Sequence, residues 1–150
     1  MPFIFLYKGD VIIMLQVYSD GVTVAAGGTY PLNSATFYKG NTVVQSAAGT
    51  AALTKRGVYL VQVDGFATVA GAGDYSIQLA VNGVPQPQAI STTTLAAAGN
   101  ASGSFSSIVT VADSDCPCNW TASATTLSII NPSTVGVTDA HINMIVSKLI

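Results

Sequence analysis

Few residues of this sequence could take part in catalysis. There is a single histidine, His141, and it follows Asp139 by two positions, so both side chains lie on one face of a strand. An Asp–His pair is part of a Ser–His–Asp triad, but the sequence has no Gly-x-Ser-x-Gly turn to supply the nucleophile. We therefore interpret Asp139 and His141 as a polar pair on a strand face, and we expect no enzymatic activity.

The two cysteines, Cys116 and Cys118, flank a proline. Residues two apart across a proline do not easily reach disulfide geometry, so these are free thiols or they pair with cysteines of another copy of the chain. If several copies met near a common axis, the thiols could bind a soft metal such as zinc. The alternative, which we favour, is a turn whose buried thiols act as small apolar groups. We expect no cofactor.

The composition limits the kind of partner this chain can bind. Of its 150 residues 49% are hydrophobic and only 8% are charged, with a net charge of -2. Nucleic-acid binding needs clustered Lys and Arg, so no nucleic-acid partner is expected. No run approaches the ~18 apolar residues of a membrane-spanning helix, so we expect no membrane insertion. Low charge leaves a small protein poorly protected against association, which favours an oligomer.

The elements that would position these side chains are strands, because apolar residues recur with a period of two. The alternation is clear in residues 74–81, 104–111 and 125–130. Residues 57–69 form a longer apolar run, which predicts a central strand covered on both faces. The residues predicted to point inward are Tyr75, Ile77, Leu79, Val81, Phe105, Val109, Val111, Leu127 and Ile129.

Turn signals separate these strands. Asp20-Gly21 predicts a short hairpin between residues 15–19 and 22–26, and Asn82-Gly83 predicts another, since both residues tolerate positive φ. Gly27-Gly28 and Pro85-Gln-Pro87 mark further turns. About ten short strands separated by such turns indicate one all-β domain, a sandwich or a barrel.

The last predicted strand carries large apolar residues on both faces. Ile142, Met144 and Val146 alternate toward one side, which we assign to the core. An outward face with several large apolar residues predicts an oligomer interface. The residues assigned to this interface are His141, Asn143, Ile145 and Leu149.

The central part of the chain resembles a known family. Residues 50–89, with Gly57-Val-Tyr59-Leu-Val61 and the Asn82-Gly83 hairpin, resemble jelly rolls of the tumour-necrosis-factor and complement-globular-head type. The similarity is closest to bacterial and phage members, such as the heads of collagen-like spore-coat glycoproteins and phage head-fibre or decoration proteins. The resemblance implies an antiparallel jelly-roll sandwich of about ten strands that assembles as a homotrimer.

The resemblance leaves the beginning of the chain uncovered. We expect residues 14–150 to form the jelly-roll head and residues 1–13 to form an N-terminal tether or extension. Phe3, Phe5 and Tyr7 lie in a short uncharged run with high β propensity, which suits the addition of a strand to an exposed sheet edge. We therefore assign attachment to this run.

Two functional hypotheses follow from the resemblance. The first is a non-enzymatic structural protein of a phage virion: a trimeric head decoration, head fibre or tail-tip domain, assembled in the host cytoplasm and displayed on the particle surface. It would contact a capsid or tail protein, and it could aid capsid stability or bind a host-surface glycan. The alternative is a trimeric bacterial surface or spore-coat protein with an adhesive or carbohydrate-binding role.

Overall fold

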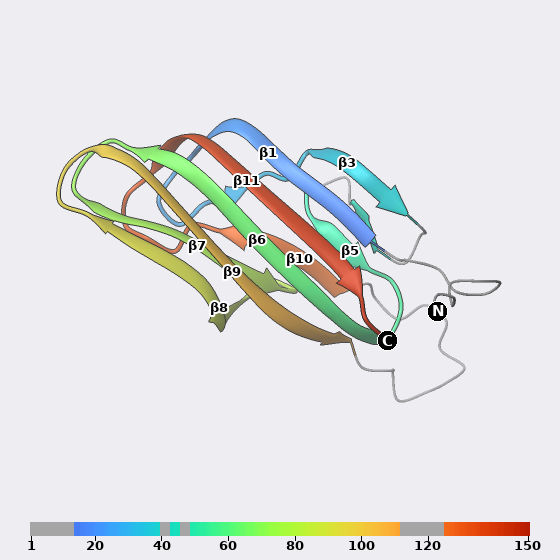
Figure 1. Cartoon of the computed structure of the whole chain (residues 1–150). Coiled ribbons are helices and arrows are strands. Elements are labelled where there is room, and N and C mark those ends of the chain that lie inside the picture. The colour runs from blue at the N-terminus through green and yellow to red at the C-terminus, as the bar shows by residue number, and fades with distance from the viewer. Residues whose placement is uncertain (1–13, 40–42, 46–48, 112–124) are drawn as a thin grey trace, which may run out of the picture.

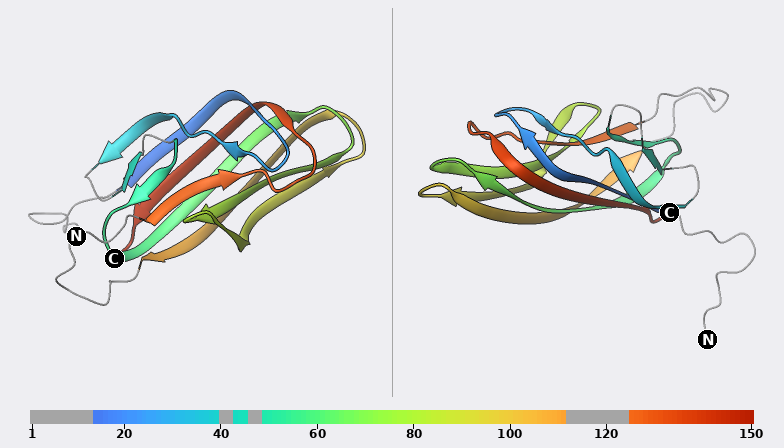
Figure 2. Two further views of the ribbon diagram at one scale, coloured as in Figure 1. Left: turned by 180° about the vertical axis from the view of Figure 1, so that it is seen from behind. Right: turned by 90° about the horizontal axis from the view of Figure 1, so that it is seen from above.

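The computed structural model describes residues 14–39, 43–45, 49–111 and 125–150, which fold into two layers of strands (Figures 1 and 2). No helix occurs in these residues, hence none that could cross a membrane. The strands of the described chain are β1 (Met14–Val24), β2 (Thr29–Tyr30), β3 (Ser34–Lys39), β4 (Val43–Gln45), β5 (Ala51–Leu53), β6 (Gly57–Val69), β7 (Gly73–Val81), β8 (Val84–Leu95), β9 (Gly99–Val111), β10 (Thr125–Ile130) and β11 (Val137–Lys148).

The strands form two antiparallel sheets. Sheet A has the order β3-β1-β11-β6-β9, and sheet B has the order β4-β5-β10-β7-β8, with the short β2 also paired to β10. In Figure 1, β1, β11, β6 and β9 run side by side across the near layer. Neighbours in both sheets are often far apart in sequence: β11, the last strand, lies between β1 and β6. The predicted all-β antiparallel sandwich is therefore confirmed.

The core lies between the sheets and is built from the side chains that alternate inward. From sheet A these include Val61 and Val63 of β6 and Met144 of β11, and from sheet B they include Ile77 and Leu79 of β7. The inward direction predicted for the three alternating segments is confirmed, and so is the core assignment in β11. The fully or nearly buried members among these predicted residues are Tyr75, Ile77, Leu79, Val109, Leu127, Ile129, Ile142, Met144 and Val146, while Val81, Phe105 and Val111 pack at the core margin.

Strand β6 differs from its prediction, because only one of its faces is covered in the single chain. Tyr59, Val61 and Val63 are buried, whereas Gln62 and Phe66 on the opposite face are exposed. The sandwich covers one face of each sheet, so a strand in the middle of sheet A still presents its other face outward. The apolar run alone could not distinguish a strand inside a sheet from a strand between two layers.

Strand β7 is more enclosed than alternation suggests, since residues on both of its faces are buried. Ser76 and Gln78 point away from the core residues of β7, yet their exposed fractions are only 3% and 9%. Their polar atoms are paired: Ser76 Oγ lies 3.0 Å from Thr92 Oγ1, and Gln78 Nε2 donates to the Gln86 carbonyl at 3.0 Å. Pairing of this kind is what allows polar side chains to be buried.

The two predicted hairpins have opposite outcomes. Asn82 and Gly83 have φ of 52° and 81° and connect β7 to β8, as predicted. The Asp20-Gly21 hairpin is wrong, because β1 continues through both residues and pairs with β11 before and after them. Gly21 has φ 69°, and the pairing shifts register between Ser19 and Val22. An Asp-Gly pair supplies positive φ to a β-bulge as readily as to a two-residue turn.

The turn predicted at Pro85-Gln-Pro87 is also wrong. Both prolines lie within β8, which is the last strand in the order of sheet B. Proline lacks the N–H that an inner strand must donate, but an edge strand has a row of N–H groups without strand partners. The edge position of β8 therefore accommodates the prolines.

Candidate interaction surface on the outer face of sheet A

The outer face of sheet A, the side turned away from sheet B, carries side chains of four adjacent strands. The register places Asn143 of β11 opposite Tyr18 of β1 and Asp64 of β6. One pair further along β11, Ile145 lies opposite Gln16 and Gln62. The outward positions of His141, Asn143 and Ile145, predicted from alternation, are confirmed by their register and partial exposure. Their role as a subunit interface stays a prediction.

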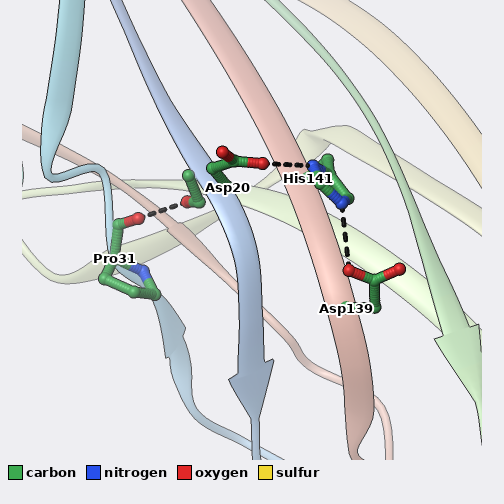
Figure 3. Close-up of polar contacts among 5 residues, drawn as sticks. Asp20, Pro31, Asp139 and His141 are labelled. Atoms are coloured by element: carbon green, nitrogen blue, oxygen red, sulfur yellow. Dashed lines mark hydrogen bonds and ion pairs between the residues drawn. The ribbon is translucent and has the colours of Figure 1, made fainter.

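His141 lies between two carboxylates at one end of this face (Figure 3). Its Nδ1 is 2.9 Å from Asp20 Oδ1, and its Nε2 is 3.1 Å from Asp139 Oδ1. The imidazole also stacks on Phe66 of β6, with ring centroids 4.6 Å apart and an interplanar angle of 16°. We call His141, Asp20, Asp139 and Phe66 the His141 cluster.

Irregularities in two paired strands bring the two carboxylates to the imidazole. The Asp20-Gly21 bulge interrupts β1 where it pairs with β11, and the β11–β6 pairing shifts between Thr138 and His141. Asp139 has φ 50°, a conformation that a non-glycine residue rarely adopts. In a regular strand, the side chains of Asp139 and His141, which are two residues apart, would project in parallel from the face. The backbone therefore determines the position of this cluster.

A hydrogen bond between side chains links β1 to β11 on this face. Gln16 Nε2 of β1 donates to Asn143 Oδ1 of β11 at 2.8 Å. Nearby, the buried Ser19 donates its hydroxyl to the Pro31 carbonyl, which ties the start of the β1 bulge to the segment after β2 (Figure 3). The two bonds therefore connect β1 to β11 and to the segment after β2, close to Asp20.

The face is hollowed beside the cluster. A hollow of about 670 Å³ extends over β1, β11, β6 and β9, and a second of about 370 Å³ adjoins it and shares Asp64, Ser104 and Asn143. Toward the other end of the strands the face also carries Ile108 of β9, which is 49% exposed. The lining of the larger hollow includes Gln16, Tyr18, Asp20, Asp64, Phe66, Ser102, Ser104, His141 and Asn143.

Beneath this face, the ring of Tyr75 of sheet B lies close to two glycines of sheet A. Gly65 and Gly103 are cross-strand partners, and a Cβ on Gly65 would lie 3.1 Å from Tyr75 Oη. Tyr75 is fully buried, and its hydroxyl has no hydrogen-bond partner among the described residues. Burial, with a smaller contribution from the charge of Asp64, raises the pKa of Tyr75 above its ordinary value. Burial likewise raises the pKa of Tyr30, with Tyr75 as a second cause.

The geometry of His141 decides what chemistry it can perform. The predicted Asp139–His141 pair is present, at 3.1 Å. A catalytic histidine needs one nitrogen directed at a nucleophile while the other is oriented by a carboxylate. Both nitrogens of His141 face carboxylates instead, so in this arrangement the ring is not placed to activate a serine.

Other predicted site residues lie elsewhere. Leu149 follows the end of β11, where its N–H donates to the Val58 carbonyl at 2.7 Å. Phe3, Phe5, Tyr7, Cys116 and Cys118 fall outside the described residues. Within the described ranges, no three His, Cys, Asp or Glu side chains are grouped so as to hold a metal ion.

Sequence reasoning missed Asp20 and Phe66 as partners of His141. The Asp-Gly dipeptide was a visible signal, but a hairpin was the simpler interpretation of it. Phe66 meets His141 only because the β6–β11 register makes them cross-strand neighbours, and their positions lie 75 residues apart in sequence. No local pattern indicates such a pairing.

Comparisons with known proteins give matches in structure alone. No family model and no curated protein matches the chain. PRD1 vertex protein P5 is similar over 95% of this chain and 100% of its own, with a TM-score of 0.59 and 16% identity.

Two animal proteins are also similar. The globular domain of zebrafish complement 1qA protein has a TM-score of 0.65 and 10% identity, and the match covers 93% of this chain and 98% of that domain. Eiger TNF from S. frugiperda has a TM-score of 0.64 and 13% identity, with coverage of 93% and 94%. At such identities the likeness concerns the fold. The chain therefore has the jelly-roll fold of the tumour-necrosis-factor and complement-globular-head type, as its sequence resemblance implied.

Proposed function

We propose that this chain is a non-enzymatic structural protein of a phage virion, displayed on the particle surface as a head decoration, head fibre or tail-tip domain. The observation that carries the proposal is the similarity to PRD1 vertex protein P5, which extends over the whole of that chain. The low charge and the β-sandwich suit a compact, closely packed surface component. The arrangement of His141, with both nitrogens at carboxylates, supports a role other than catalysis.

The proposed assembly is a homotrimer that packs through the outer face of sheet A. His141, Asn143 and Ile145 lie on this face, and Leu149 lies just beyond its edge at the end of β11. The hollows of this face have room for side chains of a second copy, and its exposed apolar side chains provide surface that the contact would bury. Burial of Ile145 against a neighbouring subunit would remove its remaining contact with water.

The test is the mass in solution of the wild type and two matched variants. Ile145→Asp places an unpaired charge in the proposed contact, so the trimer should dissociate. Val84→Asp adds the same charge to an apolar residue of sheet B that is 60% exposed, and this variant should remain trimeric. Light scattering at micromolar concentration measures both. A wild-type mass near 15.3 kDa would contradict the trimer, and a trimeric Ile145→Asp variant would contradict the assigned face.

The proposed partner is a capsid or tail protein of the same virion, reached through residues 1–13. Phe3, Phe5 and Tyr7 supply the apolar side chains for this attachment, by strand addition to an exposed edge of the partner. A host-surface glycan is a further proposed ligand of the displayed head.

A further inference from the structure

The hydrogen bonds that His141 can donate depend on whether its imidazole is neutral or protonated. A neutral imidazole carries one N–H, whereas a protonated imidazolium carries two. The ring contacts Asp20 through Nδ1 and Asp139 through Nε2, at 2.9 Å and 3.1 Å. A neutral ring can donate to only one of these carboxylates and turns a nitrogen lone pair toward the other. The protonated ring donates to both, so protonation gives each carboxylate a hydrogen bond from the ring.

Among the described residues, the charged groups that are paired with the ring or line the hollow around it are all negative. Asp20 comes from β1, Asp139 from β11 itself, and Asp64 from β6, one cross-strand pair away. β9 adds Ser102 and Ser104, which are neutral. None of the described lysines or arginines lines the larger hollow. Within the described residues, protonation of His141 is the means by which this region gains positive charge.

Subunit packing would change how water solvates these carboxylates. The side chains of Asp20 and Asp139 are 75% and 68% exposed in the single chain, and that of His141 is 31% exposed. A neighbouring subunit placed on this face would remove water from them, and a carboxylate that loses water without gaining a charged partner is costly. An imidazolium between the two carboxylates offsets this cost.

We propose that His141 makes assembly proton-dependent: the trimer contact on the outer face of sheet A is stronger with a proton on His141 than without one, so the trimer is tighter at pH 5.5 than at pH 7.5. This inference rests on the proposed trimer and names the group that regulates it. Histidine is the side chain whose charge ordinarily changes between pH 5 and 8. The sequence contains a single histidine, so each subunit has one such side chain.

The experiment measures the protein concentration at which the trimer is half dissociated, by analytical ultracentrifugation at pH 5.5, 6.5 and 7.5. We expect this concentration to fall about tenfold or more from pH 7.5 to pH 5.5. In His141→Gln, which keeps a polar group but cannot take up a proton, the three values should agree within about twofold. Circular dichroism shows whether each variant retains the wild-type fold.

Two further variants test the carboxylates. Asp20→Asn removes one partner of the ring and should reduce the pH dependence. Asp74→Asn is the matched control, because Asp74 lies on sheet B, where it accepts a hydrogen bond from Thr94 Oγ1 at 2.8 Å, and it should keep the wild-type pH dependence. If His141→Gln does not fold, the proposal is tested by comparing the pH dependence of trimer dissociation in Asp20→Asn with that in Asp74→Asn. Equal pH dependence in these two variants would overturn it.

The outcomes separate this inference from the proposed trimer. A wild-type trimer whose dissociation is the same at all three pH values overturns the role of His141 and leaves the trimer standing. A pH dependence that persists unchanged in His141→Gln overturns it as well. A wild type that is monomeric at every pH overturns both.

Discussion

His141 illustrates how much a single residue depends on its neighbours in this molecule. Sequence spacing places it beside Asp139, but Asp20 and Phe66 reach it from two other strands. Its two ring nitrogens lie within hydrogen-bond distance of carboxylates, so in the described structure the side chain forms polar contacts with Asp20 of β1 and Asp139 of β11. The residue type alone did not determine this role.

Two buried tyrosines give a prediction at the same scale. Tyr30 donates its hydroxyl to the Ser76 carbonyl at 3.1 Å, whereas the Tyr75 hydroxyl has no partner among the described residues. Tyr30→Phe should therefore lower the free energy of unfolding by about 1 kcal/mol. Tyr75→Phe should leave it unchanged or raise it by about 1 kcal/mol, because it removes a buried polar group that has no hydrogen bond.

Urea unfolding at one fixed protein concentration measures both changes. The two variants are matched, since each removes one oxygen from a tyrosine that is 0% exposed. A Tyr75→Phe variant that loses as much stability as Tyr30→Phe would show that the Tyr75 hydroxyl is satisfied, for example by a buried water molecule.

At the scale of the element, positive φ has two different uses in this sheet structure. At Asn82-Gly83 it turns the chain back into the hairpin between β7 and β8. At Gly21 it allows a bulge through which β1 continues and which presents Asp20 to His141. The same backbone conformation thus gives a turn in one place and a β-bulge within a continuous strand in another.

The hairpin turn gives a prediction that separates backbone from side-chain effects. Asn82 has φ 52°, and its Oδ1 accepts a hydrogen bond from the Thr126 N–H of β10 at 2.9 Å. Asn82→Gly keeps the backbone conformation and loses this bond together with the longer one that Thr126 Oγ1 donates at 3.4 Å, so it should lower the free energy of unfolding by about 1 kcal/mol. Asn82→Ala also strains the backbone and should cost about 2 kcal/mol.

Thermal and urea unfolding of the two variants check the difference. If Asn82→Gly and Asn82→Ala lower the free energy of unfolding equally, then the positive φ does not destabilise alanine at this position. Unchanged stability in Asn82→Gly would mean that the bond to β10 contributes nothing.

At the scale of the whole molecule, the described charges are separated along the sandwich. Lys55, Arg56 and Lys148 lie near the start of β6 and the end of β11, which are adjacent in sheet A. Asp139 lies near the start of β11, at the opposite end. Met14, where β1 begins, pairs with Ser147, so the start of β1 lies at the same end as these positive charges.

The proposed tether is tested by deleting residues 1–13. The truncated chain should remain a folded trimer with the thermal unfolding of the full chain, because it keeps every core residue of the described part of the chain. It should no longer be incorporated into particles, because the run of Phe3, Phe5 and Tyr7 is lost. Quantitative electrophoresis of purified particles measures incorporation. A narrower variant, with these three residues changed to Ser, should give the same loss.

Two results would contradict this assignment in different ways. A truncated chain that unfolds at a lower temperature would show that residues 1–13 belong to the head. A truncated trimer that still joins particles at the normal level would place the attachment surface on the jelly roll itself.

The sequence by itself determined the local features of this protein. A period of two, with β-branched and aromatic residues, specifies strands and the direction of each side chain, so Ile77, Leu79 and Met144 were correctly assigned to the core. The Asn82-Gly83 hairpin follows in the same way from the dihedral preferences of two residues. The sparse charge likewise argues against nucleic acid as a partner, because too few Lys and Arg are present to neutralise phosphates.

Only the tertiary structure decided which distant residues meet. It made Asp20-Gly21 a bulge instead of a hairpin, placed Pro85 and Pro87 on an edge strand, and left the outer face of β6 uncovered in the single chain. It also brought Asp20 and Phe66 to His141. The physical reason is that strand preference acts between sequence neighbours, whereas strand order and register are set by the burial of whole faces across the sandwich.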